Sequence, residues 1–217
     1  MADIINELKT LKIIPVIKIG DAKDALPLAR ALAEGGLPCA EVTFRTSCAA
    51  EAIKNIASHL KDDMLVGAGT VLNPRQVDEA IDAGAKFIVS PGLNPDVVKH
   101  CIKLDVPVIP GVITPTEIEL ALSLGLKVVK FFPAEAAGGL AMLKALAAPY
   151  GDIHYVPTGG IGPENLLKYL AYDKVVACGG SWMVKEEMIG AGDFASIKTL
   201  TMEAVKLRDS IGNPLAE

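Results

Sequence analysis

Long apolar runs, clusters of basic residues and a signal-peptide pattern are all lacking in this sequence. Apolar stretches such as residues 106–116 are much shorter than a membrane-spanning helix. The first seven residues carry neither the basic start nor the apolar segment of a signal peptide. The net charge is −5 and no Lys/Arg run occurs, which disfavours nucleic acid as a partner. We therefore expect a cytoplasmic protein that binds neither membranes nor nucleic acids.

Cysteine and histidine are also scarce, with four and three residues. The cysteines form no Cys-x-x-Cys pair, so we interpret them as reduced thiols rather than as a disulfide framework. They are Cys39, Cys48, Cys101 and Cys178. The three histidines are far apart, and none stands at a metal-ligand spacing from another histidine or a cysteine. The sequence therefore predicts no metal site.

Apolar and small residues are abundant instead. Hydrophobic residues make up 51% of the chain and charged residues 22%, with 20 Gly and 14 Pro. This composition is typical of a well-packed globular protein rather than a disordered one. Because α/β barrels of 217 residues form single domains, we predict one domain over residues 1–217.

Short apolar segments alternate with helical ones after a short amphipathic helix over residues 3–10. The expected strands are residues 12–19, 39–44, 64–68, 86–89, 107–109, 128–132, 153–156 and 175–178. Several of the intervening helices begin at an Asn-Pro or Thr-Pro pair, and a long helix over 194–210 closes the chain before a frayed end at 212–217. Buried parallel strands have such near-continuous apolar sequences. Eight units predict a single-domain (β/α)8 TIM barrel. The doubly wound sheet is the alternative, but its Gly-x-Gly-x-x-Gly turn after strand one is missing.

Lys130 is unusual because valine and phenylalanine flank it inside an apolar strand that Pro133 ends. A buried lysine costs free energy if it remains charged and unpaired. Its side chain could simply reach solvent or pair with a carboxylate. Alternatively, a neutral amine in such a strand is a nucleophile that can attack a carbonyl and form a Schiff base.

Glu41 is the second unusual residue. Because side chains alternate along a strand, Cys39, Glu41 and Thr43 share one face, which we expect to point into the barrel. A buried carboxylate needs a partner. It could form a structural ion pair with Lys130 or Arg45, or act as a general acid/base, and the two roles are compatible.

The other unusual residues also follow strands, where TIM-barrel enzymes place their chemistry. Arg45 follows strand two and could be a surface residue or a bidentate clamp for a substrate carboxylate. Thr70 follows a small-residue turn that could be merely tight or could leave room for substrate. This collection at one end of the barrel favours the nucleophile role for Lys130.

Two glycine pairs, Gly159-Gly160 and Gly179-Gly180, follow strands seven and eight in this prediction. One such pair is weak support, since a tight strand–helix corner also needs glycine. Two together match the common barrel phosphate site, in which backbone N–H groups and a helix N-terminus bind an anion. The hydroxyl of Ser181 could add a further donor.

Seven motifs, in order along nearly the whole chain, resemble the KDPG/KHG aldolase family. They are Glu41-Val-Thr-Phe-Arg-Thr46, Gly67-Ala-Gly-Thr-Val71, Ser90-Pro-Gly92, Gly111 with Thr114-Pro-Thr-Glu117, Lys130-Phe-Phe-Pro-Ala-Glu135, Pro157-Thr-Gly-Gly160 and Gly179-Gly-Ser-Trp182. The family comprises class I aldolases acting on 2-keto-3-deoxy-6-phosphogluconate (KDPG) and 4-hydroxy-2-oxoglutarate (KHG). One departure is Phe44, where the family often has Leu; strand alternation turns it toward the helices.

The resemblance implies a role for each matching residue. Lys130 matches the Schiff-base lysine and Glu41 the general acid/base. Residues expected at the keto-acid end of the substrate are Arg45, Thr70, Pro91 and Phe131. Those expected at the hydroxyl and phosphate end are Thr158, Gly159, Gly160, Gly180 and Ser181. The resemblance further implies a homotrimer that requires neither a metal nor an organic cofactor.

Other functions remain open at this point. The substrate could instead be the related galactonate-derived keto acid. A phosphosugar isomerase or synthase barrel would keep the phosphate site without Schiff-base chemistry, and borohydride trapping would separate it from an aldolase. A non-catalytic barrel would bind a phosphorylated metabolite without cleaving it.

Overall fold

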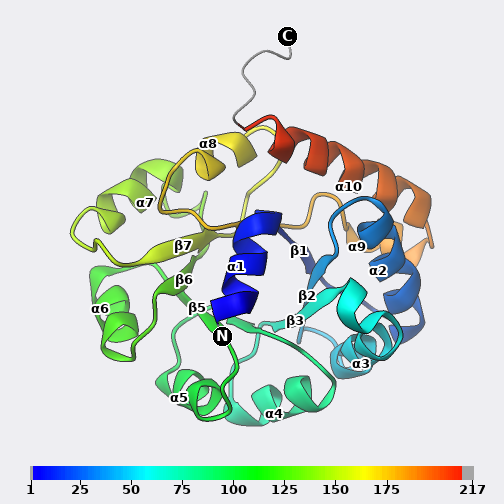
Figure 1. The fold of residues 1–217 in the computed structure, drawn as a ribbon, viewed down its shortest axis with the longest axis horizontal. Coiled ribbons are helices and arrows are strands. Elements are labelled where there is room, and N and C mark those ends of the chain that lie inside the picture. The colour runs from blue at the N-terminus through cyan, green and yellow to red at the C-terminus, as the bar shows by residue number, and fades with distance from the viewer. Residues whose placement is uncertain (1, 212–217) are drawn as a thin grey trace.

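The computed structural model describes residues 2–211 and has the predicted barrel with its N-terminal helix (Figure 1). The strands are β1 (Ile13–Ile17), β2 (Cys39–Thr43), β3 (Leu65–Gly69), β4 (Ile88–Ser90), β5 (Val108–Val112), β6 (Val128–Phe131), β7 (His154–Pro157) and β8 (Cys178–Gly180). They are parallel and follow the order β7-β6-β5-β4-β3-β2-β1-β8. Bridges from Tyr155 to Val175 and from Thr158 to Gly179 join the two edges. The prediction of frayed residues 212–217 lies outside the described residues.

Helices α2 to α10 surround the strands as an outer ring, and α1 lies across the centre of the barrel (Figure 1). Their bounds are α1 (Ala2–Leu11), α2 (Ala25–Glu34), α3 (Ala49–Leu60), α4 (Pro74–Asp82), α5 (Pro95–Lys103), α6 (Pro115–Ser123), α7 (Gly139–Ala147), α8 (Leu166–Leu170), α9 (Glu186–Gly190) and α10 (Phe194–Asp209), with short 3₁₀ turns at Ala22–Asp24 and Lys61–Asp63. In the described chain no helix has the length and apolar character needed to cross a membrane.

The proline-marked helix starts form as the sequence predicts. Asn73 caps α4 by accepting a hydrogen bond from the N–H of Gln76, and Asn94 caps α5 in the same way from Asp96. Thr114 and Glu117 form a reciprocal capping box at the start of α6. These caps fix where each helix starts after its strand, and therefore where the loops at the carboxyl ends of the strands run.

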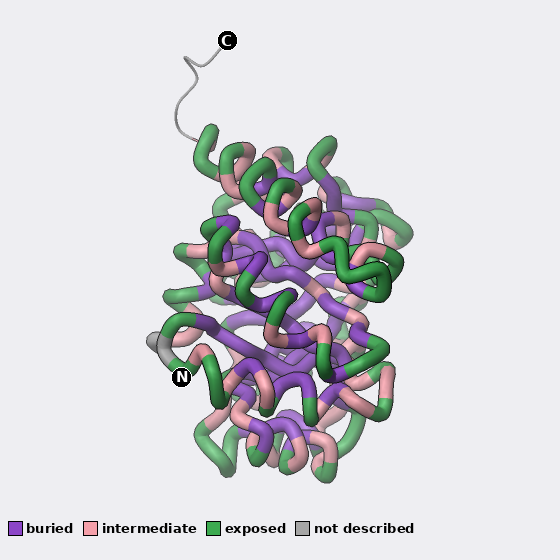
Figure 2. Tube along the Cα trace, turned by 90° about the vertical axis from the view of Figure 1, so that its right-hand side faces the viewer, coloured by how far each residue is buried: buried purple, intermediate pink, exposed green. Residues whose placement is uncertain are grey.

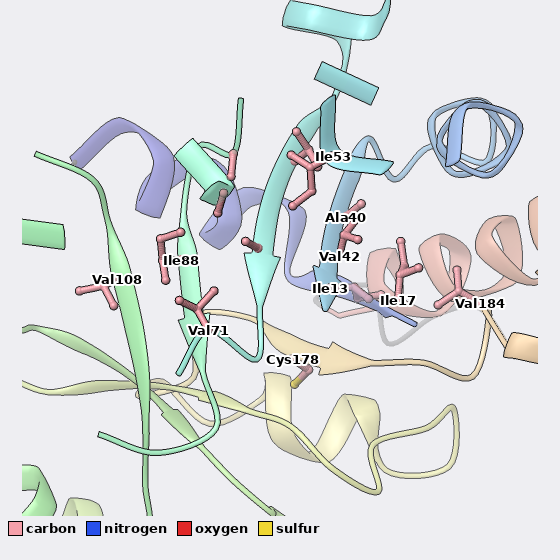
Figure 3. Packing of buried hydrophobic residues seen from close by; sticks show 14 of the residues in the cluster. Ile13, Ile17, Ala40, Val42, Ile53, Val71, Ile88, Val108, Cys178 and Val184 are labelled. Atoms are coloured by element: carbon pink, nitrogen blue, oxygen red, sulfur yellow. The ribbon is translucent and has the colours of Figure 1, made fainter. Parts of the chain in front are cut away.

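The apolar core has two parts. An outer cluster, which includes Ile17, Val42 and Val129, packs the strands against the surrounding helices, and Figure 3 shows some of its members. An inner cluster fills the barrel near the amino ends of the strands and includes Ile14, Cys39 and Leu8 of α1. Helix α1 lies across this end of the barrel (Figure 1), and the buried backbone runs through the centre of the molecule (Figure 2). The buried polar residues of the interior, such as Glu41 and Lys130, therefore lie toward the carboxyl ends of the strands.

Strand β8 differs from the prediction, because it begins at Cys178 rather than at Val175. Gly179 and Gly180 therefore lie within the strand instead of following it, paired with Ile14 and Pro15 of β1. The apolar segment before it is buried at Val176 and Ala177 but makes only an isolated bridge with β7. The apolar sequence of this segment correctly predicted that it is buried. It did not predict where β8 begins, because that depends on the pairing with β1 and β7.

Candidate active site

Lys130 of β6 and Glu41 of β2 meet inside the barrel, although they lie on strands far apart in the sheet order. Their side chains are 7% and 3% exposed, and Lys130 Nζ lies 3.6 Å from Glu41 Oε1. This separation is longer than a hydrogen bond, so a proton passes between the two groups only when they approach further or through one intervening water. The barrel thus brings the predicted nucleophile and the predicted acid/base together.

Glycines occupy the strand positions beside this pair, and one of them, Gly69, makes room for the Glu41 carboxylate. Glu41 is paired in register with Gly67, and Lys130 with Gly111. A Cβ at position 69 would lie 2.1 Å from Glu41 Oε1, and one at position 67 would lie 2.4 Å from the ring of Phe87. Gly67 and Gly69 lie within β3 rather than in the expected turn, so close side-chain packing is what requires them.

Substituting Gly69 by alanine should displace the Glu41 carboxylate and lower turnover by about 100-fold, the scale of effect that a misplacement of roughly 1 Å can have. Steady-state kinetics would measure it. The matched control is Gly151→Ala, because a Cβ there meets nothing within 4 Å. Equal activity of the two variants would contradict the importance of the Glu41 position.

Phe132, not Phe131, faces the lysine. The Phe132 ring centroid lies 5.2 Å from Lys130 Nζ, whereas Phe131 is fully buried in the outer cluster between strands and helices. The expected pocket-wall position of Phe131 does not agree with this arrangement. Strand alternation predicts this choice between the two phenylalanines, because residues 130 and 132 share a face while residue 131 points away.

Arg45 and Ser181 line one cavity of about 270 Å³ at the carboxyl ends of β1, β2 and β8. Arg45 is held by a hydrogen bond of 3.1 Å from its Nε to Thr43 Oγ1. Lys18, which the sequence analysis did not single out, lines the same cavity and pairs with Glu186 of α9 at 2.8 Å. Its signal was a lysine at the end of β1, on the same strand face as Val16.

Thr70 and Pro91 also lie at this end of the barrel. Thr70 directly follows β3 and has φ +56, an unusual backbone conformation for a β-branched residue and one that clusters at functional sites. Pro91 follows β4, and its carbonyl oxygen would lie only 2.0 Å from a Cβ at Gly111, the neighbour of Lys130. The turn after β4 therefore closes over the strand beside the lysine.

We call residues 158–160 the glycine loop. Thr158 is buried, and its hydroxyl lies 2.4 Å from where a Cβ of Gly179 would be, so this loop touches β8. Gly159 and Gly160 have φ +99 and +77, a region that residues with a side chain rarely adopt. Gly180 lies beneath the ring of Trp182, with no space for a side chain. The loop that carries Gly159 and Gly160 is thus joined to β8, the strand of Gly180, by the bridge between Thr158 and Gly179.

The arrangement provides a buried amine and carboxylate, with a guanidinium and a hydroxyl in a cavity at the same end. Another cavity, of about 350 Å³, lies at the opposite end beside α1, with apolar lining residues such as Ile5 and Leu126. It contains no acid/base pair. Among the side chains that the structure describes, no group of three or more histidine, cysteine or acidic residues could hold a metal ion.

Comparison with known proteins identifies the family. The family model described as KDPG and KHG aldolase matches residues 4–200. A 2-dehydro-3-deoxy-phosphogluconate aldolase of Treponema pallidum is 52% identical over 207 residues, covering 95% of this chain and 98% of the relative.

Two solved structures are similarly close. A 2-keto-3-deoxy-6-phosphogluconate aldolase of Zymomonas mobilis with 3-phosphoglycerate has a TM-score of 0.85 and 44% identity, covering 92% of this chain and 94% of the other. A KDPG aldolase from Legionella pneumophila, with pyruvate captured as a covalent carbinolamine, has a TM-score of 0.86 and 40% identity, covering 90% and 97%. The chain belongs to the KDPG and KHG aldolase family.

Proposed function

We propose that Lys130 and Glu41 together catalyse the cleavage of 2-keto-3-deoxy-6-phosphogluconate to pyruvate and glyceraldehyde 3-phosphate through a Schiff base. The reaction class, that of a carbon–carbon lyase, follows from the family and the close relatives. The observation that carries the residue assignment is the buried contact of 3.6 Å between the amine and the carboxylate. The same residues would also accept 4-hydroxy-2-oxoglutarate, which carries the same keto-acid end.

The amine of Lys130 attacks the C2 ketone and gives a carbinolamine, which loses water to form an iminium. Glu41, directly or through a water, removes the proton of the C4 hydroxyl. The C3–C4 bond then breaks, its electron pair moves toward the iminium nitrogen, and glyceraldehyde 3-phosphate leaves. The enamine that remains takes a proton at C3 from Glu41, and hydrolysis releases pyruvate and restores the amine.

Arg45, Thr70 and Pro91 serve the keto-acid end in this proposal. The guanidinium of Arg45 can bind the substrate carboxylate in bidentate fashion, and its hydrogen bond to Thr43 Oγ1 limits the directions it can take. Thr70 is close to the Glu41 face of the barrel, because Gly69 just before it contacts that carboxylate. The substrate carboxylate would thus be fixed while C2 lies next to the amine.

Thr158, the glycines of the loop, Gly180 and Ser181 serve the hydroxyl and phosphate end. Their support is the bridge between Thr158 and Gly179, which joins the segments at the ends of β7 and β8, the place where barrel enzymes commonly bind phosphate. Phe132 beside the amine excludes water from one side of the reacting centre. We therefore replace Phe131 by Phe132 in the proposed pocket wall.

Borohydride reduction in the presence of pyruvate tests the nucleophile. We expect a pyruvate-derived adduct on Lys130, located by peptide mass mapping, because reduction traps the iminium as a stable amine. Lys127, three residues earlier and with a 69% exposed side chain, is the internal control and should remain unmodified. An adduct on a different lysine would move the active site away from Lys130. No adduct on active, folded protein would favour an isomerase or synthase without Schiff-base chemistry.

We further propose that the protein is a homotrimer in the cytoplasm. The family resemblance supports the trimer, and exposed apolar side chains at Ile102 of α5, Leu104 just after it and Leu120 of α6 offer apolar surface for contacts between copies. All four cysteines are free thiols, in keeping with a reducing compartment. Light scattering should give three times the 22.7 kDa of the chain.

A further inference from the structure

Three hydrogen bonds to its backbone carbonyl groups hold the glycine loop in place. The carbonyl of Thr158 accepts a hydrogen bond from the N–H of Ala134 at 2.8 Å, and that of Gly159 accepts one from Glu135 at 3.0 Å. The carbonyl of Gly160 accepts one from Asn165 Nδ2 at 2.9 Å. Two of the three bonds come from the segment that follows β6, so the shape of the loop depends on where residues 134 and 135 lie.

Glu135 is the side chain that holds this segment against the loop. Its Cβ and Cγ would lie 2.7 and 2.8 Å from a Cβ at Gly160, so the stem of the glutamate packs directly on the loop backbone. The hydroxyl of Tyr169, in α8, donates a hydrogen bond to Glu135 Oε1. Gly139 at the start of α7 leaves space for both groups, since a Cβ there would lie 3.1 Å from the carboxylate and 3.4 Å from the hydroxyl.

Tyr169 is suited to be a permanent donor. Its side chain is only 1% exposed, and burial, together with the hydrogen bond to Glu135, raises the pKa of the phenol well above its ordinary value. It therefore remains protonated throughout the neutral range. Glu135, by contrast, is exposed and has no ion-pair partner among the described residues, so without the tyrosine hydroxyl its carboxylate would turn toward water.

We propose that the Tyr169–Glu135 hydrogen bond holds the glycine loop in the shape that receives the phosphate of the substrate, which makes both residues positioning residues for phosphorylated substrates. The bond connects α8, which follows the loop, with the segment after β6 that lies beneath it. In the described chain no hydrogen bond or ion pair links either residue to Lys130, and the inference rests on the proposed function of the loop as the phosphate end.

The test is Tyr169→Phe, which removes one oxygen and preserves the buried ring. We expect KM for 2-keto-3-deoxy-6-phosphogluconate to rise about tenfold, the loss that one hydrogen bond to a charged group typically causes. KM for the unphosphorylated 4-hydroxy-2-oxoglutarate, and kcat for both substrates, should change less than about twofold on the same reasoning. Glu135→Ala should likewise raise KM for the phosphorylated substrate alone. Glu135→Gln, which keeps an acceptor oxygen, should have the KM and kcat values of the wild-type protein.

Tyr150→Phe is the matched control, because Tyr150 donates to Glu119 at 3.1 Å in a comparable tyrosine–glutamate pair away from the loop. Calorimetry with 6-phosphogluconate, which has no ketone and cannot form a Schiff base, measures phosphate binding independently of catalysis. Wild-type protein that cleaves neither substrate would overturn the proposed function alone, and calorimetry would then decide the positioning role. Equal KM changes for both substrates, or unchanged affinity for 6-phosphogluconate in Tyr169→Phe, would overturn the inference.

Discussion

Lys130→Met is expected to abolish turnover while leaving the fold intact. Methionine resembles lysine in length and flexibility but has no amine, so no carbinolamine or iminium can form. The position is 6% exposed and lies between Gly111 and Val156 of the adjacent strands, where an apolar side chain is readily accommodated. Aldol cleavage can be followed by the release of pyruvate, and folding by circular dichroism and the midpoint of thermal unfolding.

The matched control for this variant is Lys127→Met, which removes the same charge from an exposed side chain three residues earlier. It should retain nearly full activity. Removing Lys130 also leaves the buried Glu41 without its positive neighbour, so a lower thermal midpoint is compatible with the proposal as long as the protein remains folded. Substantial cleavage by folded Lys130→Met protein would eliminate the Schiff-base mechanism.

The contact between Lys130 and Glu41 could be anticipated from two local patterns. Strand alternation turned Glu41 inward, and a lysine among apolar residues in β6 had to point either to solvent or into the barrel. Closure of the barrel then brings β2 and β6 across from each other, as their places in the strand order imply. The separation of 3.6 Å, however, depends on Gly69, whose missing side chain makes room for the carboxylate.

Phe131 shows where resemblance alone was insufficient. Two consecutive phenylalanines follow the lysine, and the motif does not say which one lines the pocket. The structure places Phe131 in the outer cluster and the Phe132 ring 5.2 Å from the amine. Alternation would have distinguished them, since only residue 132 lies on the Lys130 face.

The contacts of Lys18 and of the pair Tyr169–Glu135 could not be found from sequence patterns. Lys18 reaches the cavity only because β1 lies between β2 and β8, and its partner Glu186 is 168 residues away. Tyr169 and Glu135 are 34 residues apart on segments that meet only after the barrel closes. Local patterns identify which residues are unusual in their segment, whereas such contacts depend on the tertiary arrangement.

Glu41→Gln is expected to slow proton transfer by about 10²–10⁴-fold, the usual contribution of a positioned general acid or base. The amide has almost the same shape as the carboxylate and fits beside Gly69, but it cannot take up a proton at neutral pH. Adduct formation and proton exchange should therefore respond differently. Lys130 would still form the adduct with pyruvate that borohydride traps, whereas exchange of the C3 protons of pyruvate for deuterium from the solvent would become slow.

The two measurements on Glu41→Gln distinguish a catalytic carboxylate from a purely structural one. A structural ion pair would lose adduct formation and proton exchange together, because the lysine would be displaced in the resting protein. The acid/base role predicts loss of exchange with the adduct retained. Glu51→Gln in the first turn of α3 is the matched control and should change neither. Near-normal exchange in Glu41→Gln would remove this residue from the mechanism and leave the proton to a water near Lys130.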